Sequence, residues 1–314
     1  MKKLLIACGA LAGGVYALGT FMHNALINRN FEMPESVSKM ISESEADDLT
    51  DEKNEAAMWL ESAGMEKHEM INDRGHKLRG YLLRPKKPSD VYVFGSHGYR
   101  SDGKGEWCII AQHYVNDLGY NVFFVDHQAA GESEGKYIGF GSFESKDSLK
   151  WLRYMTETFG EDIKIILHGI SMGSATVMLM SGSDALPKNV KFTVADCGYT
   201  SALDEFNYKL ESLGVPRKPI IPLVRAINNQ RAGYDFGNDT NALEAVKNAK
   251  VPMLFIHGGD DKFVPTYMVY LLFDACQSEY KDMFIAPGAD HAESYHKAKA
   301  QYEGKIAEFT EKFI

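Results

Sequence analysis

The chain has 314 residues, of which 45% are hydrophobic and 25% are charged, a composition typical of a globular protein with a sizeable core. Its 34 basic and 43 acidic residues give a net charge of −9, and the basic residues form no cluster, which excludes a nucleic-acid-binding protein. Four cysteines are too few for a disulfide scaffold, and the lack of CxxC and HExxH motifs leaves no metal-binding pattern.

The first predicted element is an apolar N-terminal segment. Two lysines precede a run from Leu4 to Ile27 that contains no Asp, Glu, Lys or Arg, and about 20 apolar residues suffice to span a bilayer. We predict that residues 1–28 form a transmembrane anchor, with a secretory signal cut after Gly19 as the alternative. The flanking lysines predict a cytoplasmic N-terminus and a catalytic domain outside the cell. The acidic residues 29–64 that follow are predicted to be a tether or a loosely held helix.

From residue 65 to residue 314, short apolar runs alternate with helix-like stretches. Such runs are typical of strands buried on both faces of a parallel sheet, and the first two flank a turn that predicts an antiparallel hairpin. The alternation predicts an α/β fold with a mostly parallel eight-stranded sheet and an antiparallel start. The predicted strands are 65–71, 78–83, 91–94, 121–125, 163–167, 192–195, 253–256 and 283–285, and the predicted helices include 106–118, 143–159, 175–180 and 266–276.

Residues 198–237 interrupt this alternation, because they are too many for one crossover helix. We predict that they form a small helical cap over the carboxyl edge of the sheet. An extra helical pair packed on the side of the sheet is the alternative. The apolar residues at helical spacing in this segment are Leu203, Phe206, Leu210 and Leu213.

Two G-x-S-x-G motifs compete as the site of a nucleophile, one centred on Ser133 and one on Ser171. A sharp turn from strand to helix exposes a serine hydroxyl only if small residues flank the serine. Ser171 follows the predicted strand 163–167 and precedes a helix-like run, which is the required context. Ser133 lies between two glutamates, whose charge would oppose an oxyanion. We therefore predict that Ser171 is the nucleophile and that Ser133 is a loop serine.

A serine hydroxyl needs a base, and the base needs an orienting carboxylate. The order of serine, acid and histidine along the chain is expected for this type of sheet. The last two predicted strands end in loops that carry Asp260 and Asp261, and Asp290 and His291. Ligands bind at this carboxyl edge in open α/β sheets. The pattern predicts His291 as the base and either Asp260 or Asp261 as the acid.

With these motifs in order, residues 65–314 resemble the α/β-hydrolase superfamily, in particular its serine-aminopeptidase-like (hydrolase-4) branch. Together with the N-terminal segment, they are similar to membrane-anchored, largely uncharacterised hydrolases of Gram-positive bacteria. The motifs that carry the resemblance are Ser96-His97-Gly98-Tyr99, Asp126-His127-Gln128-Ala129-Ala130-Gly131-Glu132-Ser133, Gly169 to Gly173, Ala195-Asp196-Cys197, Gly258-x-x-Asp261-x-x-Val264-Pro265 and Gly288-Ala289-Asp290-His291.

The resemblance implies an α/β-hydrolase fold and adds detail to the site. It assigns the acid to Asp261, and it implies an oxyanion hole made by the backbone N–H groups of Tyr99 and Met172. Two preorganised donors of this kind stabilise the developing charge, and the loss of one costs roughly 10²–10³ in rate. The family pattern has an Arg-Gly pair where this chain has Gln128 and Ala129, so substrate contacts of relatives through that arginine do not transfer.

These residues predict a serine hydrolase that acts on carboxylic esters, as an esterase, thioesterase or lipid acyl esterase, without cofactor or metal. The expected partner is a small acyl substrate, with lipid-like acyl groups favoured by the apolar insertion. A serine peptidase or aminopeptidase is the alternative, in which Glu205 or Glu211 would bind the amino terminus of a substrate. A further alternative is an inactive, surface-anchored binding module with the hydrolase fold.

Overall fold

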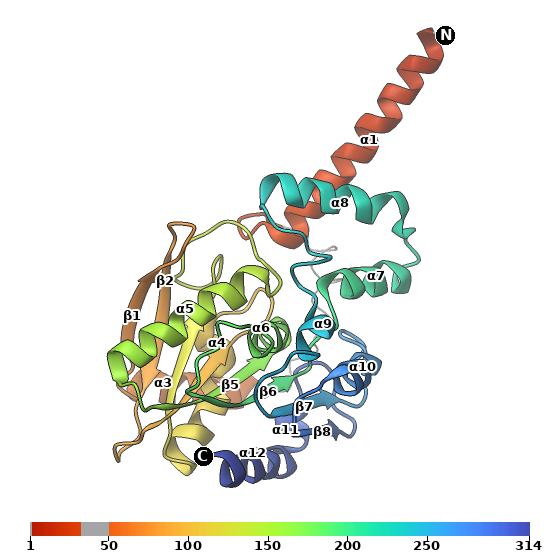
Figure 1. Ribbon diagram of the computed structural model, residues 1–314. Helices are drawn as coiled ribbons and strands as arrows, with labels where there is room; N and C mark the ends of the chain where they lie inside the picture. The colour runs from red at the N-terminus through yellow and green to blue at the C-terminus, as the bar shows by residue number, and fades with distance from the viewer. Residues whose placement is uncertain (1, 33–49) are drawn as a thin grey trace.

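The computed structural model describes residues 2–32 and 50–314, with side chains from residue 13 onward and again from residue 52 (Figure 1). Its centre is an eight-stranded sheet in the order β1-β2-β4-β3-β5-β6-β7-β8. The pairs β1–β2 and β2–β4 are antiparallel and all the others are parallel, which confirms the predicted α/β-hydrolase sheet. The strands are β1 Glu66–Ile71, β2 Lys77–Leu83, β3 Val91–Ser96, β4 Asn121–Asp126, β5 Lys164–Ile170, β6 Val190–Asp196, β7 Met253–Gly258 and β8 Lys281–Ala286.

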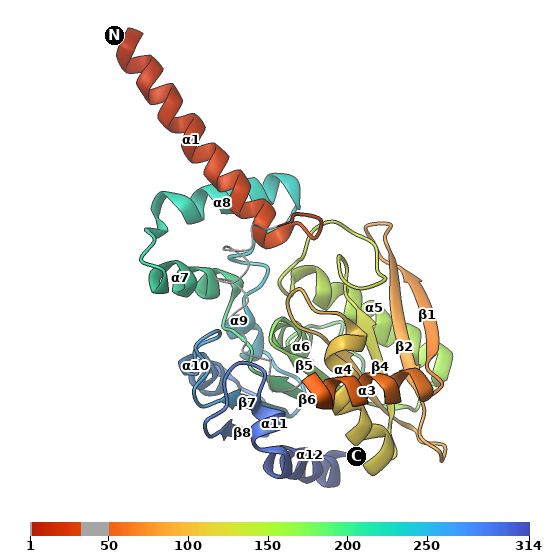
Figure 2. The same cartoon turned by 180° about the vertical axis from the view of Figure 1, so that it is seen from behind.

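Helices cover both faces of the sheet (Figures 1 and 2). One core joins the sheet to α3, α4 and α12, and the opposite core joins it to α5, α6 and α10. The helices are α1 Lys2–Ile27, α3 Thr50–Ser62, α4 Gly103–Gln112 with a π-helical continuation His113–Asp117, α5 Ser142–Phe159, α6 Met172–Ser181, α7 Ala202–Ser212, α8 Arg217–Arg231, α9 Ala242–Val246, α10 Tyr267–Ala275, α11 Ser294–Lys297 and α12 Lys299–Phe313.

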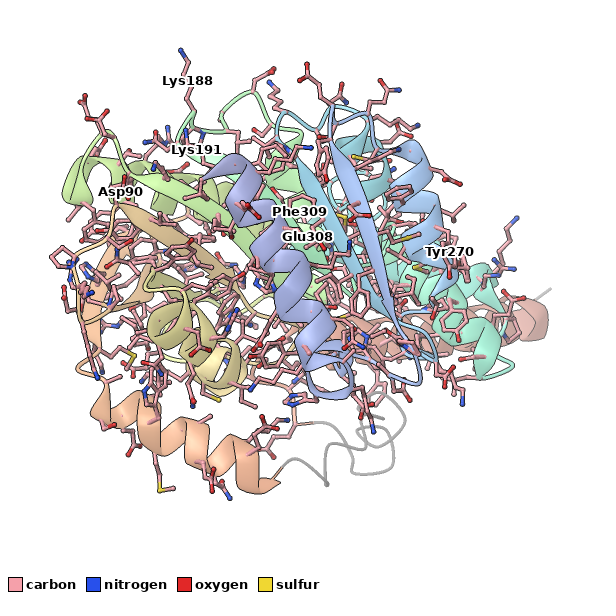
Figure 3. All side chains as sticks on the ribbon, turned by 90° about the horizontal axis from the view of Figure 1, so that it is seen from below. Asp90, Lys188, Lys191, Tyr270, Glu308 and Phe309 are labelled. Atoms are coloured by element: carbon pink, nitrogen blue, oxygen red, sulfur yellow. The ribbon has the colours of Figure 1, made fainter. Side chains whose placement is uncertain are left out.

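Aromatic side chains fill the space between the helices and the sheet. Phe309 of α12, which is labelled in Figure 3, packs against Phe192 of β6 with ring centroids 5.5 Å apart. On β3, an added Cβ at Gly95 would lie 2.5 Å from the indole of Trp107, so only glycine allows this fully buried ring to lie on the strand. Burial of each such side chain contributes about 1.5–3 kcal/mol. This packing fixes the strands whose carboxyl ends carry the candidate site.

The N-terminal helix α1 leaves the body of the protein beside α8 (Figures 1 and 2). Its final turns bury Ala25 and Ile27 against the rest of the chain. No helix among the residues whose side chains are described is long and apolar enough to cross a membrane. The predicted anchor spans residues 1–28, so its first part lies outside those residues.

The structure describes part of the acidic segment 29–64 and all of the insertion 198–237. Of the acidic segment 29–64, residues 33–49 lie outside the described residues, whereas α3 buries Ala56 and Leu60 in the core. The insertion 198–237 contains α7 and α8. Both helices contribute side chains to a cavity that reaches Ser171, as described below.

Candidate active site

Ser171 occupies a strained turn between β5 and α6. Its backbone angles are φ 56° and ψ −115°, a conformation that costs a non-glycine residue on the order of 1–3 kcal/mol. An added Cβ at Gly169 would lie 2.1 Å from the carbonyl oxygen of Gly173, and one at Gly173 would lie 2.0 Å from that of Ser96. Only glycine fits at either position, which gives the physical reason for the G-x-S-x-G pattern. The turn presents the Ser171 side chain at the carboxyl edge of the sheet.

The structure brings the predicted serine, histidine and aspartate together. Ser171 Oγ lies 2.9 Å from His291 Nε2, and His291 Nδ1 lies 2.8 Å from Asp261 Oδ2. The three residues come from the turn after β5, the loop after β8 and the loop after β7. Of the two candidate acids, Asp260 is exposed and Asp261 is the one that contacts the imidazole. Asp290 accepts a hydrogen bond from the backbone N–H of His291 and leaves the ring to Asp261.

Asp261 is a buried carboxylate with four contacts. Its Oδ1 accepts hydrogen bonds from the backbone N–H groups of Phe263 and Val264, both at 2.9 Å. Its Oδ2 contacts His291, and it lies 3.2 Å from His257 Nε2. Burial by itself would raise the pKa of Asp261, but the hydrogen bonds from His257 and His291 outweigh it and lower the pKa to about 2. Asp261 is therefore an anion at neutral pH and can stabilise a protonated imidazole.

The loop after β3 lies against the serine. An added Cβ at Gly98 would lie 3.3 Å from Ser171 Cβ, and the Gly98 N–H donates to Glu106 Oε2 at 2.8 Å. Because Glu106 occupies that donor, the next amide in the loop is that of Tyr99. Met172 is the first residue of α6, and the first N–H groups of a helix have no partner within the helix. These two amides are the predicted oxyanion hole. Sequence reasoning missed Glu106, whose only signal was a carboxylate in the first turn of the helix after this loop.

The hydroxyl of Ser133, the serine of the competing motif, makes two hydrogen bonds within the protein. Its Oγ donates to the Asp126 carbonyl at 2.6 Å and accepts from the Arg79 N–H at 2.9 Å. The residue is buried, and these bonds attach the loop after β4 to strand β2. Ser133 is thus a loop serine, with its hydroxyl used in holding the loop.

Comparison with known proteins identifies the family of the chain. Residues 110–314, well over half of the chain, match the model of the prolyl oligopeptidase family, Peptidase_S9. The chain belongs to the prolyl oligopeptidase family. It is 26% identical over 312 residues to the uncharacterized protein YqkD of Bacillus subtilis, an alignment that covers 98% of this chain and 97% of YqkD.

Solved structures show the same fold at low sequence identity. The esterase Pf2001 of Pyrococcus furiosus is 20% identical, with a TM-score of 0.65 over 80% of this chain and 92% of that one. Acetyl xylan esterase 1 of Thermoanaerobacterium is 16% identical, with a TM-score of 0.53 over 87% of this chain and 98% of that one. The likeness shows that the chain has the α/β-hydrolase fold, and these two structural neighbours are named as esterases.

A cavity of about 420 Å³ opens beside Ser171. Its walls come from α1, α7, α8 and the loops around the triad, and they are mostly apolar. An apolar cavity next to a candidate nucleophile suits the acyl group of a substrate. Representative lining residues are Leu18, Phe21 and Met22 of α1, Phe206 and Leu210 of α7, and Val224 of α8.

Glu205 of α7 lines the same cavity and is an exception to its apolar character. The side chain is buried, and within the described part of the chain neither carboxylate oxygen accepts a hydrogen bond. Burial raises the pKa of Glu205 to about 8, the charge of Asp261 adds to this, and Lys209 opposes it. The group is therefore largely protonated at neutral pH. Glu211, the other acidic residue considered above, is exposed.

Replacing Glu205 with glutamine is expected to change how stability depends on pH. The unfolded chain loses this proton near pH 4.5, whereas the folded protein keeps it until about pH 8, so wild-type stability falls as pH rises between these values. Glutamine does not ionise. The variant should therefore unfold at similar urea concentrations to the wild type near pH 4, and be more stable by up to a few kcal/mol near pH 9. Glu211→Gln on the same helix is the matched control, and parallel pH curves for Glu205→Gln and the wild type would contradict the assignment.

One group of side chains among the described residues has ligands that could hold a metal ion: His113, Asp117 and Glu303. His113 Nδ1 lies 3.0 Å from an Asp117 oxygen and 3.4 Å from a Glu303 oxygen. One ring nitrogen faces both carboxylates, so the group is a polar cluster around His113. It shares no residue with the cavity at Ser171.

Proposed function

We propose that the protein is a serine hydrolase that cleaves carboxylic esters through an acyl-enzyme on Ser171. The observation that carries the proposal is the 2.9 Å contact between Ser171 Oγ and His291 Nε2 at the wall of an apolar cavity. A nucleophile and base within hydrogen-bond distance, with the base oriented by a carboxylate, is the arrangement required for covalent catalysis.

The mechanism follows from the positions of these groups. His291 accepts the Ser171 proton as the oxygen attacks the substrate carbonyl, and the N–H groups of Tyr99 and Met172 stabilise the oxyanion. The imidazolium, stabilised by Asp261, then donates the proton to the leaving alcohol. Water, deprotonated by His291, attacks the acyl-enzyme, and the imidazolium returns this proton to Ser171 Oγ as the carboxylic acid leaves.

Two features favour an ester over other substrates. The cavity walls are apolar, so they suit an acyl chain better than the polar backbone of a peptide. Two of the structural neighbours are named as esterases. The assignment to the serine-aminopeptidase-like branch within the superfamily stays a prediction.

A serine peptidase is the second candidate, and two observations favour it. The matching family is a peptidase family, and Glu205 places a buried carboxyl group in the cavity. A protonated Glu205 would be a weak partner for a substrate ammonium group, which favours the ester. An inactive binding module is the third candidate, and the short contacts among Ser171, His291 and Asp261 count against it.

Initial rates of the full chain on p-nitrophenyl esters, from acetate to dodecanoate, test the proposal against aminoacyl p-nitroanilides. We expect hydrolysis of the esters, with the highest kcat/KM at an intermediate or long acyl chain because each buried methylene contributes about 0.8 kcal/mol. Ser171→Ala provides the blank. Faster cleavage of the anilides would favour the peptidase, and Ser171-independent rates on both would favour the inactive module.

For location, we propose membrane attachment through residues 1–28 with the catalytic domain outside the cell. The run without charged residues and the two preceding lysines support this orientation. Release into the medium after cleavage at Gly19 is the alternative. Fractionation of cells, followed by protease treatment of intact cells, separates the two.

A further inference from the structure

The end of α1 is bound to the loop that carries Tyr99. The last four carbonyls of an α-helix have no partner within the helix, and a helix end that packs inside a protein needs other donors. In α1 the donors include side chains from the loop after β3. In chain order, the carbonyls of residues 24 to 27 accept from Asn28 N at 3.1 Å, Arg100 Nη2 at 2.7 Å, Tyr99 Oη at 2.7 Å and Ile138 N at 2.9 Å.

The preceding turns of α1 form one wall of the cavity at Ser171. Leu18, Phe21 and Met22 line it. The helix crosses α8 closely at Gly19, where an added Cβ would lie 2.6 Å from Leu223 Cδ2. The glycine of the predicted cleavage site is therefore also a packing residue between α1 and α8. Without α1, the cavity would be open on this side.

We propose that α1 forms part of the active site and has two roles there. Leu18, Phe21 and Met22 determine which acyl chains the cavity accepts, and the last carbonyls of the helix position the loop that carries Tyr99. This inference rests on the proposed function and adds a substrate class, esters with a long, apolar acyl chain. The same helix that was predicted to attach the protein to a membrane thus contributes directly to substrate selection.

The acyl-chain part of the proposal predicts that changes in the wall formed by α1 alter the selectivity between long and short acyl chains. Phe21 is partly exposed, so Phe21→Ala removes a wall of the cavity at little risk to folding. A lost methylene contact costs roughly fourfold in kcat/KM, so the ratio of decanoate to acetate hydrolysis should fall at least about fivefold. Met22→Trp, which fills the cavity, should move the preferred acyl chain to a shorter length.

Tyr16→Ala is the matched control, because Tyr16 is exposed on the same helix and does not line the cavity. Its decanoate-to-acetate ratio should equal that of the wild type. An unchanged ratio in both Phe21→Ala and Met22→Trp, with wild-type melting temperatures, would overturn the proposal. Equal shifts in the Tyr16 variant would overturn it as well, because the effect would then come from the helix in general.

The positioning part of the proposal is tested with Tyr99→Phe, which keeps the ring and the backbone N–H but removes the bond to the Leu26 carbonyl. We expect kcat to fall several-fold on acetate and decanoate alike with KM unchanged, because the oxyanion donor acts in the transition state. A rise in KM alone would indicate that Tyr99 only contacts the substrate, and would overturn this part.

Reaction of Ser171 with alkyl fluorophosphonates of two chain lengths separates this inference from the proposed function, because labelling requires no turnover. A wild type that hydrolyses no ester would contradict the proposed function. The ratio of long-chain to short-chain labelling rates would still report how well the cavity accepts a long chain, and Phe21→Ala should lower this ratio. The same ratio in the wild type and Phe21→Ala would overturn the role of α1.

Discussion

Replacing Ser171 with alanine is expected to lower kcat on p-nitrophenyl esters by about 10⁴–10⁶-fold, because the acyl-enzyme can no longer form. The remaining rate would come from the oxyanion donors and substrate binding, which still act on attack by water. The Ser171 hydroxyl donates to His291 Nε2, and alanine removes this hydrogen bond. Alanine tolerates the strained turn about as well as serine, so the variant should unfold at nearly the same denaturant concentration.

Ser133→Ala is the control, since the same change is made at the centre of the other G-x-S-x-G motif. It leaves a buried carbonyl and a backbone N–H without the Ser133 hydroxyl, which costs about 1–3 kcal/mol of stability. Its kcat/KM should stay within about twofold of wild type. Steady-state kinetics and urea unfolding of both variants show which of the two motifs contains the nucleophile. Loss of activity in Ser133→Ala with activity retained in Ser171→Ala would mean that the wrong motif was chosen.

Much of this site could be predicted from the sequence, because the candidate catalytic residues come directly after the ends of predicted strands. Buried parallel strands appear in a sequence as short apolar runs, and their carboxyl ends meet at one edge of the sheet. Ser171 and His291 each follow such a run, so their proximity follows from the topology. The choice between Asp260 and Asp261 needed the resemblance, because adjacent carboxylates differ only in the direction of their side chains.

The role of α1 could not be predicted, for a physical reason. A helix without charged residues has the same sequence pattern whether lipid or protein covers it. The carbonyls of Ala25 and Leu26 are backbone groups, so their bonds to Arg100 and Tyr99 leave no trace in the residue types. Glu205 poses a similar problem. It is next to Phe206 on the helix, and helical spacing alone did not distinguish a buried carboxyl from a solvated one.

Replacing Asp261 with asparagine is expected to lower kcat about 10⁴-fold while leaving KM for the ester nearly unchanged. The carboxylate accepts the His291 Nδ1 proton at 2.8 Å, which leaves Nε2 free to accept the Ser171 proton. Asparagine can keep its oxygen toward the N–H groups of Phe263 and Val264, and its amide then donates to His291. This reverses the tautomer, so Nε2 carries a proton and cannot act as a base.

Asp260→Asn is the matched control, because the two residues are adjacent and Asp260 is exposed. Its kcat should stay within about threefold of wild type. If Asp260→Asn had the larger effect, the acid would be misassigned.

The dependence of stability on pH offers a second test of the role of Asp261. Since the pKa of Asp261 is lowered to about 2 in the folded protein, its ionised form stabilises the fold above about pH 4, and this contribution is lost as pH falls towards 2. Asp261→Asn lacks this contribution, so the difference in unfolding free energy between wild type and Asp261→Asn should shrink as the pH falls. The difference between wild type and Asp260→Asn should not shrink in this way.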